Sequence, residues 1–141
     1  MKTCPSVPCE EGAQLLGVMT PGGLAYVRPP ATVDADFAAR ARALGRPERR
    51  FRFSGPCVEG RCPQWTGERC AVADVVADSA AGRAVVQPGR LPACTIRGTC
   101  RWYAQRGPAA CAACPLVVSD MGGTRTYRYG DVTAPGDPAS P

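Results

Sequence analysis

The stretch that decides this fold runs from residue 94 to residue 115 and reads CTIRGTCRWYAQRGPAACAACP. It holds four of the nine cysteines, and seven of the nine lie between Cys57 and Cys114. A free thiol is a redox and metal liability unless it is buried, paired in a disulfide or coordinated. What this protein does therefore depends on which of these states its cysteines adopt.

Length and composition predict one ordinary domain that would gain stability from a metal or disulfide staple. The chain has 141 residues, of which 16 are Gly and 15 are Pro, so turns and loops are abundant. No apolar run approaches the roughly 18 residues of a membrane span, and the first residues have no apolar signal region. We expect a cytoplasmic protein without a membrane partner. Reducing conditions there favour metal binding over disulfides, which stay open as an alternative for a secreted form.

The chain has no histidine. This excludes mixed cysteine and histidine zinc sites, Rieske centres, histidine-ligated haem and histidine-based catalysis. Sulfur is then the expected ligand, with carboxylate as the other ready donor. The candidate metal ligands are Cys57, Cys62, Cys70, Cys94, Cys100, Cys111, Cys114, Cys9 and Cys4.

The spacing of these cysteines favours an iron–sulfur cluster over zinc. Zinc ribbons draw ligands from two short knuckles, whereas this chain has one C-x2-C pair, at Cys111 and Cys114, and the longer x4 gap at Cys4/Cys9 and Cys57/Cys62. The other gaps are irregular, which suits a larger centre reached from several loops, although the ferredoxin runs are absent. The seven central cysteines plus Cys4 or Cys9 would ligate two four-sulfur sites, so we expect one or two clusters, with 4Fe-4S favoured and zinc as the alternative.

Arginine supplies most of the net charge of +5, and no acid lies between Asp78 and Asp120. A four-thiolate zinc site or an oxidised four-iron cluster carries about −2, so these arginines can balance a buried negative centre. In the alternative, a zinc-stabilised module presents them to RNA or a protein partner. The contact candidates would be Arg97, Arg101, Trp102, Arg50 and Arg52.

Outside the cysteines, the N-terminal pattern predicts a hairpin followed by a helix. Residues 14–19 and 24–28 flank a Pro-Gly-Gly turn, which is typical of a β-hairpin. Apolar residues then recur at helical spacing over 33–44, with Thr32 or Asp34 as the cap.

Further elements follow along the chain. Residues 49–53 alternate arginine and phenylalanine, which predicts a strand with one wet face. Residues 71–80 place Val72, Val75 and Val76 on one helical face, with a strand as the rival interpretation.

The C-terminal part is expected to contain two short helices and two strands. Thr99 can cap a helix that ends at Gly107, and Pro108 can open a second one that carries Cys111 and Cys114. Strands are predicted at 116–118 and 124–129.

These patterns define an α+β protein in three parts. We expect a small α+β portion over residues 1–56, a loop-rich, metal-stapled cysteine portion with a terminal strand over 57–129, and a disordered tail over 130–141.

From the sequence we expect an iron–sulfur protein that transfers electrons or serves as an accessory to a redox enzyme. We do not expect it to be an enzyme on its own. Its partner would be a redox protein or enzyme, with nucleic acid a possible but less favoured partner. Thiol–disulfide chemistry at Cys111 and Cys114 is a weaker alternative, because it leaves the other cysteines unexplained.

Overall fold

A four-stranded antiparallel sheet carries the N-terminal part of the computed structural model, which describes residues 1–84 and 90–118. The strands are β1 (Thr3–Val7), β2 (Gln14–Thr20), β3 (Gly23–Thr32) and β4 (Phe51–Pro56), in the spatial order β1-β4-β2-β3. With the helices described below, this sheet confirms the predicted α+β class.

The predicted hairpin and first helix are both present. Strands β2 and β3 pair from Thr20 and Gly23 at the turn, where Thr20 Oγ1 donates to the Gly23 carbonyl across 2.6 Å. Asp34 is the N-cap residue of helix α1 (Ala35–Ala43), and its side chain accepts from the Phe37 N–H at 2.7 Å. Such a cap satisfies one of the N–H groups that a helix start leaves without a partner.

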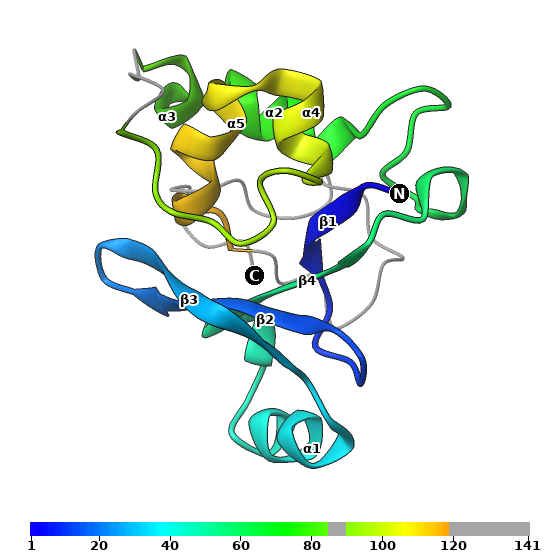
Figure 1. Ribbon diagram of the computed structural model, residues 1–141, viewed down its shortest axis with the longest axis vertical. Helices are drawn as coiled ribbons and strands as arrows, with labels where there is room; N and C mark the ends of the chain where they lie inside the picture. Colours follow the sequence, from blue (N-terminus) through cyan, green and yellow to red (C-terminus); the bar gives the residue numbers. More distant parts are fainter. Residues whose placement is uncertain (85–89, 119–141) are drawn as a thin grey trace.

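Helices cover both sides of the sheet (Figure 1). Helix α1 lies on one side, and α2 (Ala71–Asp78), α3 (Ala80–Arg83), α4 (Arg101–Arg106) and α5 (Pro108–Ala113) gather on the other. Short 3-10 turns lie at Pro47–Arg49, Glu59–Arg61 and Cys114–Leu116.

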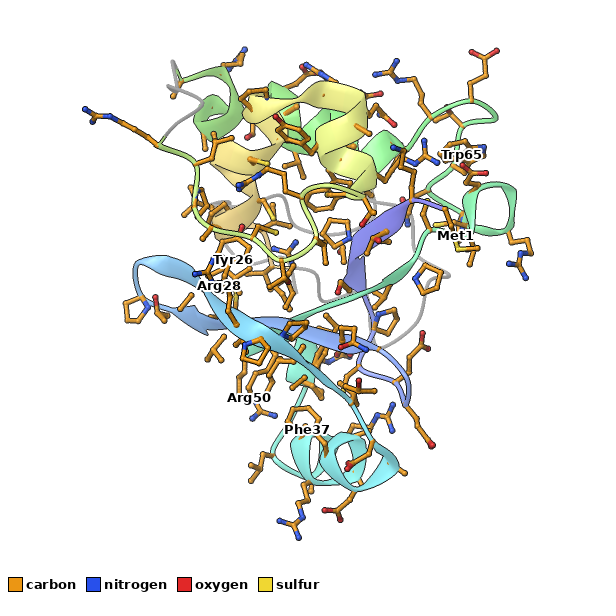
Figure 2. All side chains as sticks on the ribbon, viewed as in Figure 1. Met1, Tyr26, Arg28, Phe37, Arg50 and Trp65 are labelled. Carbon is orange, nitrogen blue, oxygen red and sulfur yellow. The ribbon has the colours of Figure 1, made fainter. Side chains whose placement is uncertain are left out.

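Strand β4 shows how the two layers are built. Its side chains alternate between faces, as in any strand. Phe51 and Phe53 pack on Phe37 of α1, with ring centroids 5.6 and 6.3 Å away, and Figure 2 shows Phe37 between α1 and the sheet. Arg52 points the other way, toward Trp102 and the helices.

The core accordingly has two parts. One lies between the sheet and α1 and includes Val7, Val33 and Phe53. The other lies among α2, α4 and α5, where alanines let short helices approach closely around Trp102. None of the helices within residues 1–84 and 90–118 is long and apolar enough to cross a membrane.

Strand β4 corrects the first of several local predictions. It begins at Phe51 rather than residue 49, and its expected wet face is wrong, because Arg52 is 0% exposed. The strand lies inside the sheet between β1 and β2, with helices on both sides.

In α2 the helical prediction is right and the rival strand wrong. Val72 and Val76 are buried, but Val75 is 42% exposed. The buried pair recurs at i and i+4, with Ala73 and Ala77 completing the buried face.

Two C-terminal predictions are also corrected. Cys100, not Thr99, is the N-cap residue of α4. Residues 116–118 form no strand, since Cys114–Leu116 is a 3-10 turn and Val117 packs into the helical core. The predicted strand at 124–129 and the tail at 130–141 lie outside the described residues.

Candidate metal centres

Eight of the nine cysteines fall into two sets of four, each lining its own cavity. The first cysteine pocket is lined by Cys4, Cys57, Cys62 and Cys70 and has about 530 Å³ of empty space, including space open to solvent. The second cysteine pocket contains about 320 Å³ on the same measure, and its cysteines are Cys94, Cys100, Cys111 and Cys114. The space open to the centre of a water-sized sphere is much smaller, about 40 Å³ in the first pocket and about 20 Å³ in the second.

Strand pairing brings together the first two members of the first cysteine pocket. Cys4 lies in β1, and Cys57 directly follows β4, the antiparallel neighbour of β1. The Cys57 N–H donates to the carbonyl of Lys2 at 2.9 Å, which continues the ladder beyond the strands. Two cysteines 53 positions apart in the sequence therefore reach one cavity.

The other two members of the first pocket follow in the connection from β4 to α2. Cys62 ends the 3-10 turn Glu59–Arg61, where its N–H donates to the Glu59 carbonyl at 2.8 Å. Cys70 is the N-cap residue of α2. Burial raises the pKa of the Cys70 thiol, while the N–H groups of Ala73 and Val72 donate to its sulfur and oppose that shift.

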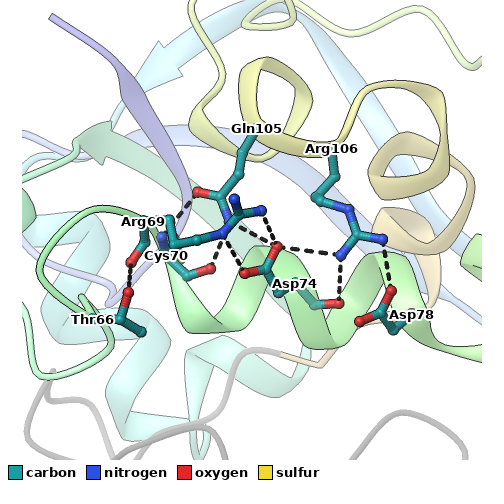
Figure 3. Close-up of polar contacts among 7 residues, drawn as sticks. All are labelled: Thr66, Arg69, Cys70, Asp74, Asp78, Gln105 and Arg106. Atoms are coloured by element: carbon teal, nitrogen blue, oxygen red, sulfur yellow. Dashed lines mark hydrogen bonds and ion pairs between the residues drawn. The ribbon is translucent and has the colours of Figure 1, made fainter.

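A polar network fixes the backbone of Cys70 (Figure 3). Gln105 of α4 accepts from the Cys70 N–H at 2.9 Å and donates to the Cys70 carbonyl at 2.8 Å. Gln105 also donates to Asp74, which forms ion pairs with Arg69 and Arg106. The network connects the start of α2 to α4. It therefore fixes Cys70, which lines the first pocket, relative to the helix that begins after Cys100 of the second pocket.

The second cysteine pocket is built from one compact segment. Cys94 lies in the loop before α4, and Cys100 is the N-cap residue of α4. Cys111 lies in α5, and Cys114 follows three residues later at its C-terminal end, so both face the same side of the helix. Gly107, at φ +66°, makes the bend between α4 and α5 that brings these elements together.

Backbone N–H groups converge on two sulfurs of this second pocket. Cys94 accepts from Ile96 and Arg97, and Cys100 from Tyr103 and Trp102. Burial nevertheless dominates, and it raises the pKa of Cys100 to about 12. These N–H groups would stabilise thiolates once a metal centre replaced the protons.

Side-chain donors reach the remaining two sulfurs. Arg97 Nε lies 3.4 Å from Cys111 Sγ, and Arg52 Nη2 lies 3.4 Å from Cys114 Sγ. Tyr26 also forms a hydrogen bond with Cys114. Burial is the largest cause that raises the pKa of Tyr26, and the Cys114 sulfur is the next. Figure 2 shows Tyr26 on the side of β3 that faces the helices. The second pocket thus combines four thiols with two guanidinium groups and a phenol.

Arg52 is the most unusual of these donors, because its side chain is completely buried. It donates to the carbonyls of Pro5, Cys114 and Val117 and lies over the Trp102 ring, 5.5 Å from the centroid. Among the described residues no carboxylate pairs with it in a salt bridge. A buried cation is costly unless an anion compensates it, so a negative centre at Cys114 would suit this site.

Arg101 provides a similar indication at the first cysteine pocket. Its side chain lines the cavity, forms an ion pair with Glu59 and lies over Trp65, 4.9 Å from the ring centroid. Its Nε is buried and has no hydrogen-bond partner within the described structure. Buried N–H groups are nearly always satisfied, so this donor is suited to an acceptor held in the cavity.

Cys9 lies apart from both pockets, although it was among the expected ligands. It is 2% exposed and packs in the core between the sheet and α1. Its N–H donates to the Glu48 carboxylate at 2.7 Å, and its carbonyl accepts from Arg42. Of the two N-terminal cysteines, the structure brings Cys4 and not Cys9 to a four-cysteine set.

The residues expected to contact RNA or a protein partner are engaged within the molecule. Trp102 is 2% exposed and Arg52 is buried, which corrects their assignment to a contact surface, because Trp102 lines both pockets and Arg52 lies over its ring. Arg97 and Arg101 make the pocket contacts described above. Arg50 donates to the Ala41 carbonyl at 2.6 Å and lies over Phe51.

All nine cysteines lie within the described residues, and no disulfide joins them. Within residues 1–84 and 90–118, no three or more Cys, Asp or Glu side chains are grouped so that they could hold a single metal ion. The cysteines of each set instead surround a cavity. Tyr26 and Gln105 are site residues that sequence reasoning missed, since neither carries a local signal.

Comparison of the chain with protein-family models, curated proteins and solved structures finds no match in any of the three.

Proposed function

We propose that this protein binds two 4Fe-4S clusters, one in each cysteine pocket, and transfers electrons to or from a redox protein or enzyme. One observation carries the proposal: eight cysteines divide into two sets of four, each around its own cavity. Four thiolates are the ligand set of a 4Fe-4S cluster. Cys9 is then a core residue and not a ligand.

The spread of the cysteines favours clusters over zinc. Four thiolates bind zinc at about 2.3 Å, so they converge on a single point. Within the described residues no three cysteines are grouped closely enough to hold a single metal ion, and each set of four instead surrounds a cavity, as the ligands of a polynuclear centre do.

Charge gives a second line of support. The chain carries +5, and two oxidised clusters with four thiolates each would contribute about −4 in total, which leaves about +1. The buried Arg52 and the unsatisfied Arg101 Nε both lie where such negative centres would compensate them.

The arrangement suits electron transfer better than catalysis by a single open metal. Each cavity has a full set of four cysteines, so neither cluster needs an exogenous ligand. Trp102 lines both cavities, which makes the two centres immediate neighbours. A reducing cytoplasm is the compartment we propose for this chemistry, because it keeps the eight thiols available for the clusters.

Anaerobic purification of the full chain tests the proposal. We expect a brown protein with broad absorbance near about 400 nm and about eight iron and eight sulfide per chain. About four of each would restrict the proposal to one pocket. A colourless protein with stoichiometric zinc would refute the cluster and support the zinc-stabilised module, and a metal-free protein with fewer than two free thiols would support disulfides.

A further inference from the structure

The two cysteine pockets differ in the charge that surrounds their sulfur atoms. In the second pocket, Arg97 and Arg52 each approach a sulfur at 3.4 Å, and Tyr26 adds a hydrogen bond to Cys114. In the first pocket the lining cation is Arg101, whose charge is offset by its ion pair with Glu59. The second pocket therefore has the more positive surroundings.

Neither cation of the second pocket forms a salt bridge within the described structure. Besides sulfur, Arg52 contacts backbone carbonyls and the Trp102 ring, and Arg97 donates to the carbonyl of Pro92 and lies 6.0 Å from the Tyr103 ring centroid. Their charge is thus directed at the sulfurs without a competing carboxylate.

This difference has a defined effect on reduction potential. Reduction makes a cluster more negative by one charge, so nearby cations and hydrogen-bond donors to sulfur favour the reduced state and raise the potential. Two cysteines of the second pocket, Cys100 and Cys114, are also each only 8% exposed, and burial alone would lower the potential. The same burial strengthens the pull of the guanidinium groups, because it lowers the effective dielectric around them.

The geometry points to two clusters of unequal potential, with the cluster of the second cysteine pocket as the electron acceptor within the molecule. This inference rests on the proposed function. With a cluster held by the four cysteines of each pocket, one electron would pass from the first pocket to the second, so that the first centre would be oxidised and the second reduced by one electron, with no bond made or broken. An external one-electron donor protein supplies that electron. Trp102, buried and shared by both linings, fills the space that the electron crosses.

A potentiometric titration with dithionite, followed by electron paramagnetic resonance on the anaerobic full chain, tests this inference. We expect two separate one-electron reductions in the wild type. Arg97→Gln removes the cation and the Nε donor beside Cys111, so the higher-potential reduction should move to lower potential while the other stays. Cys62→Ala, which removes a ligand of the first pocket, should abolish the lower-potential reduction.

Two further variants keep the test decisive. Tyr26→Phe retains the ring but removes the donor to Cys114, and it should lower the same reduction even if Arg97→Gln fails to fold. Arg83→Gln, at an exposed position at the end of α3, is the matched arginine control and should move neither.

The outcomes separate this inference from the proposed function. If the chain binds about eight iron and sulfide but Arg97→Gln and Tyr26→Phe move the lower-potential reduction, or neither reduction, the inference is overturned and the proposed function stands. If the purified chain holds no iron and sulfide, the proposed function itself fails.

Discussion

Arg52 donates from Nη2 to the Sγ of Cys114 at 3.4 Å, across the boundary between the sheet and the helices. The same side chain donates to the carbonyl of Pro5 in β1 and to those of Cys114 and Val117. A single buried side chain therefore fixes β1, β4 and the end of α5 relative to one another.

Arg52→Met should destabilise the protein by about 3–5 kcal/mol, since it leaves three buried carbonyls and a sulfur without their donor. Chemical denaturation of wild type and variant under anaerobic conditions measures this loss. Arg40→Met is the matched control, because Arg40 pairs with Asp36 on the exposed face of α1 and should change stability by no more than about 0.5 kcal/mol. Equal losses for the two variants would contradict the role given to Arg52.

Single Cys→Ala variants should sort ligands from the bystander. Changes at Cys111 or Cys114 should remove the iron of the second cysteine pocket, and a change at Cys4 should remove that of the first, because each set has only four sulfurs. Cys9→Ala should keep the full iron content, since Cys9 lines neither cavity. Iron and sulfide analysis measures each result, and full iron in the Cys111→Ala Cys114→Ala double variant would refute the assignment.

Gln105→Leu should weaken the first cysteine pocket before the second. It removes both hydrogen bonds to the half-buried Cys70 backbone, at a cost of about 1–3 kcal/mol for the two bonds together. The expected readout is faster loss of half of the bound iron to a chelator, with the other half unchanged. Ala104→Leu, at the exposed neighbouring position of α4, is the control. Uniform release of all iron would show that Gln105 does not act on one pocket.

The metal-free protein should lose stability in alkali. Burial raises the pKa of Cys100 to about 12, from an ordinary value of 9.0, so the folded thiol holds its proton more tightly than the unfolded one. Its contribution to stability is complete below about pH 9 and is lost as the pH rises toward about 12. Cys100→Ala should flatten this alkaline decline in urea denaturation, and an unchanged decline would contradict it.

The same shift predicts that loading with metal releases protons. Burial also raises the pKa values of Cys94 and Cys111, so these thiols are protonated near pH 7 and must lose their protons to bind. Assembly of the clusters should accordingly be favoured as the pH rises from 6 to about 8, which reconstitution followed by absorbance would measure.

Local signals in the sequence are sufficient for the regular elements. The Pro-Gly-Gly turn and the Asp34 cap predict the hairpin and α1, and Gly107 with Pro108 predicts the break between α4 and α5, because turns and caps depend on a few adjacent residues. The absence of histidine and the count of nine cysteines likewise identify sulfur as the candidate ligand, because the choice of donor atoms depends on composition alone.

Only the tertiary structure decided how the cysteines are grouped. Cys4 and not Cys9 reaches a pocket because β1 pairs with β4, and Arg52 is buried because β4 lies inside the sheet. The spacing of neighbouring residues predicts neither of these long-range contacts. Residue types and turns are local properties of the chain. The division into two sets of four is a property of distant strands and helices brought together by packing, and it is this division that gives each cavity its sulfur, charge and shape.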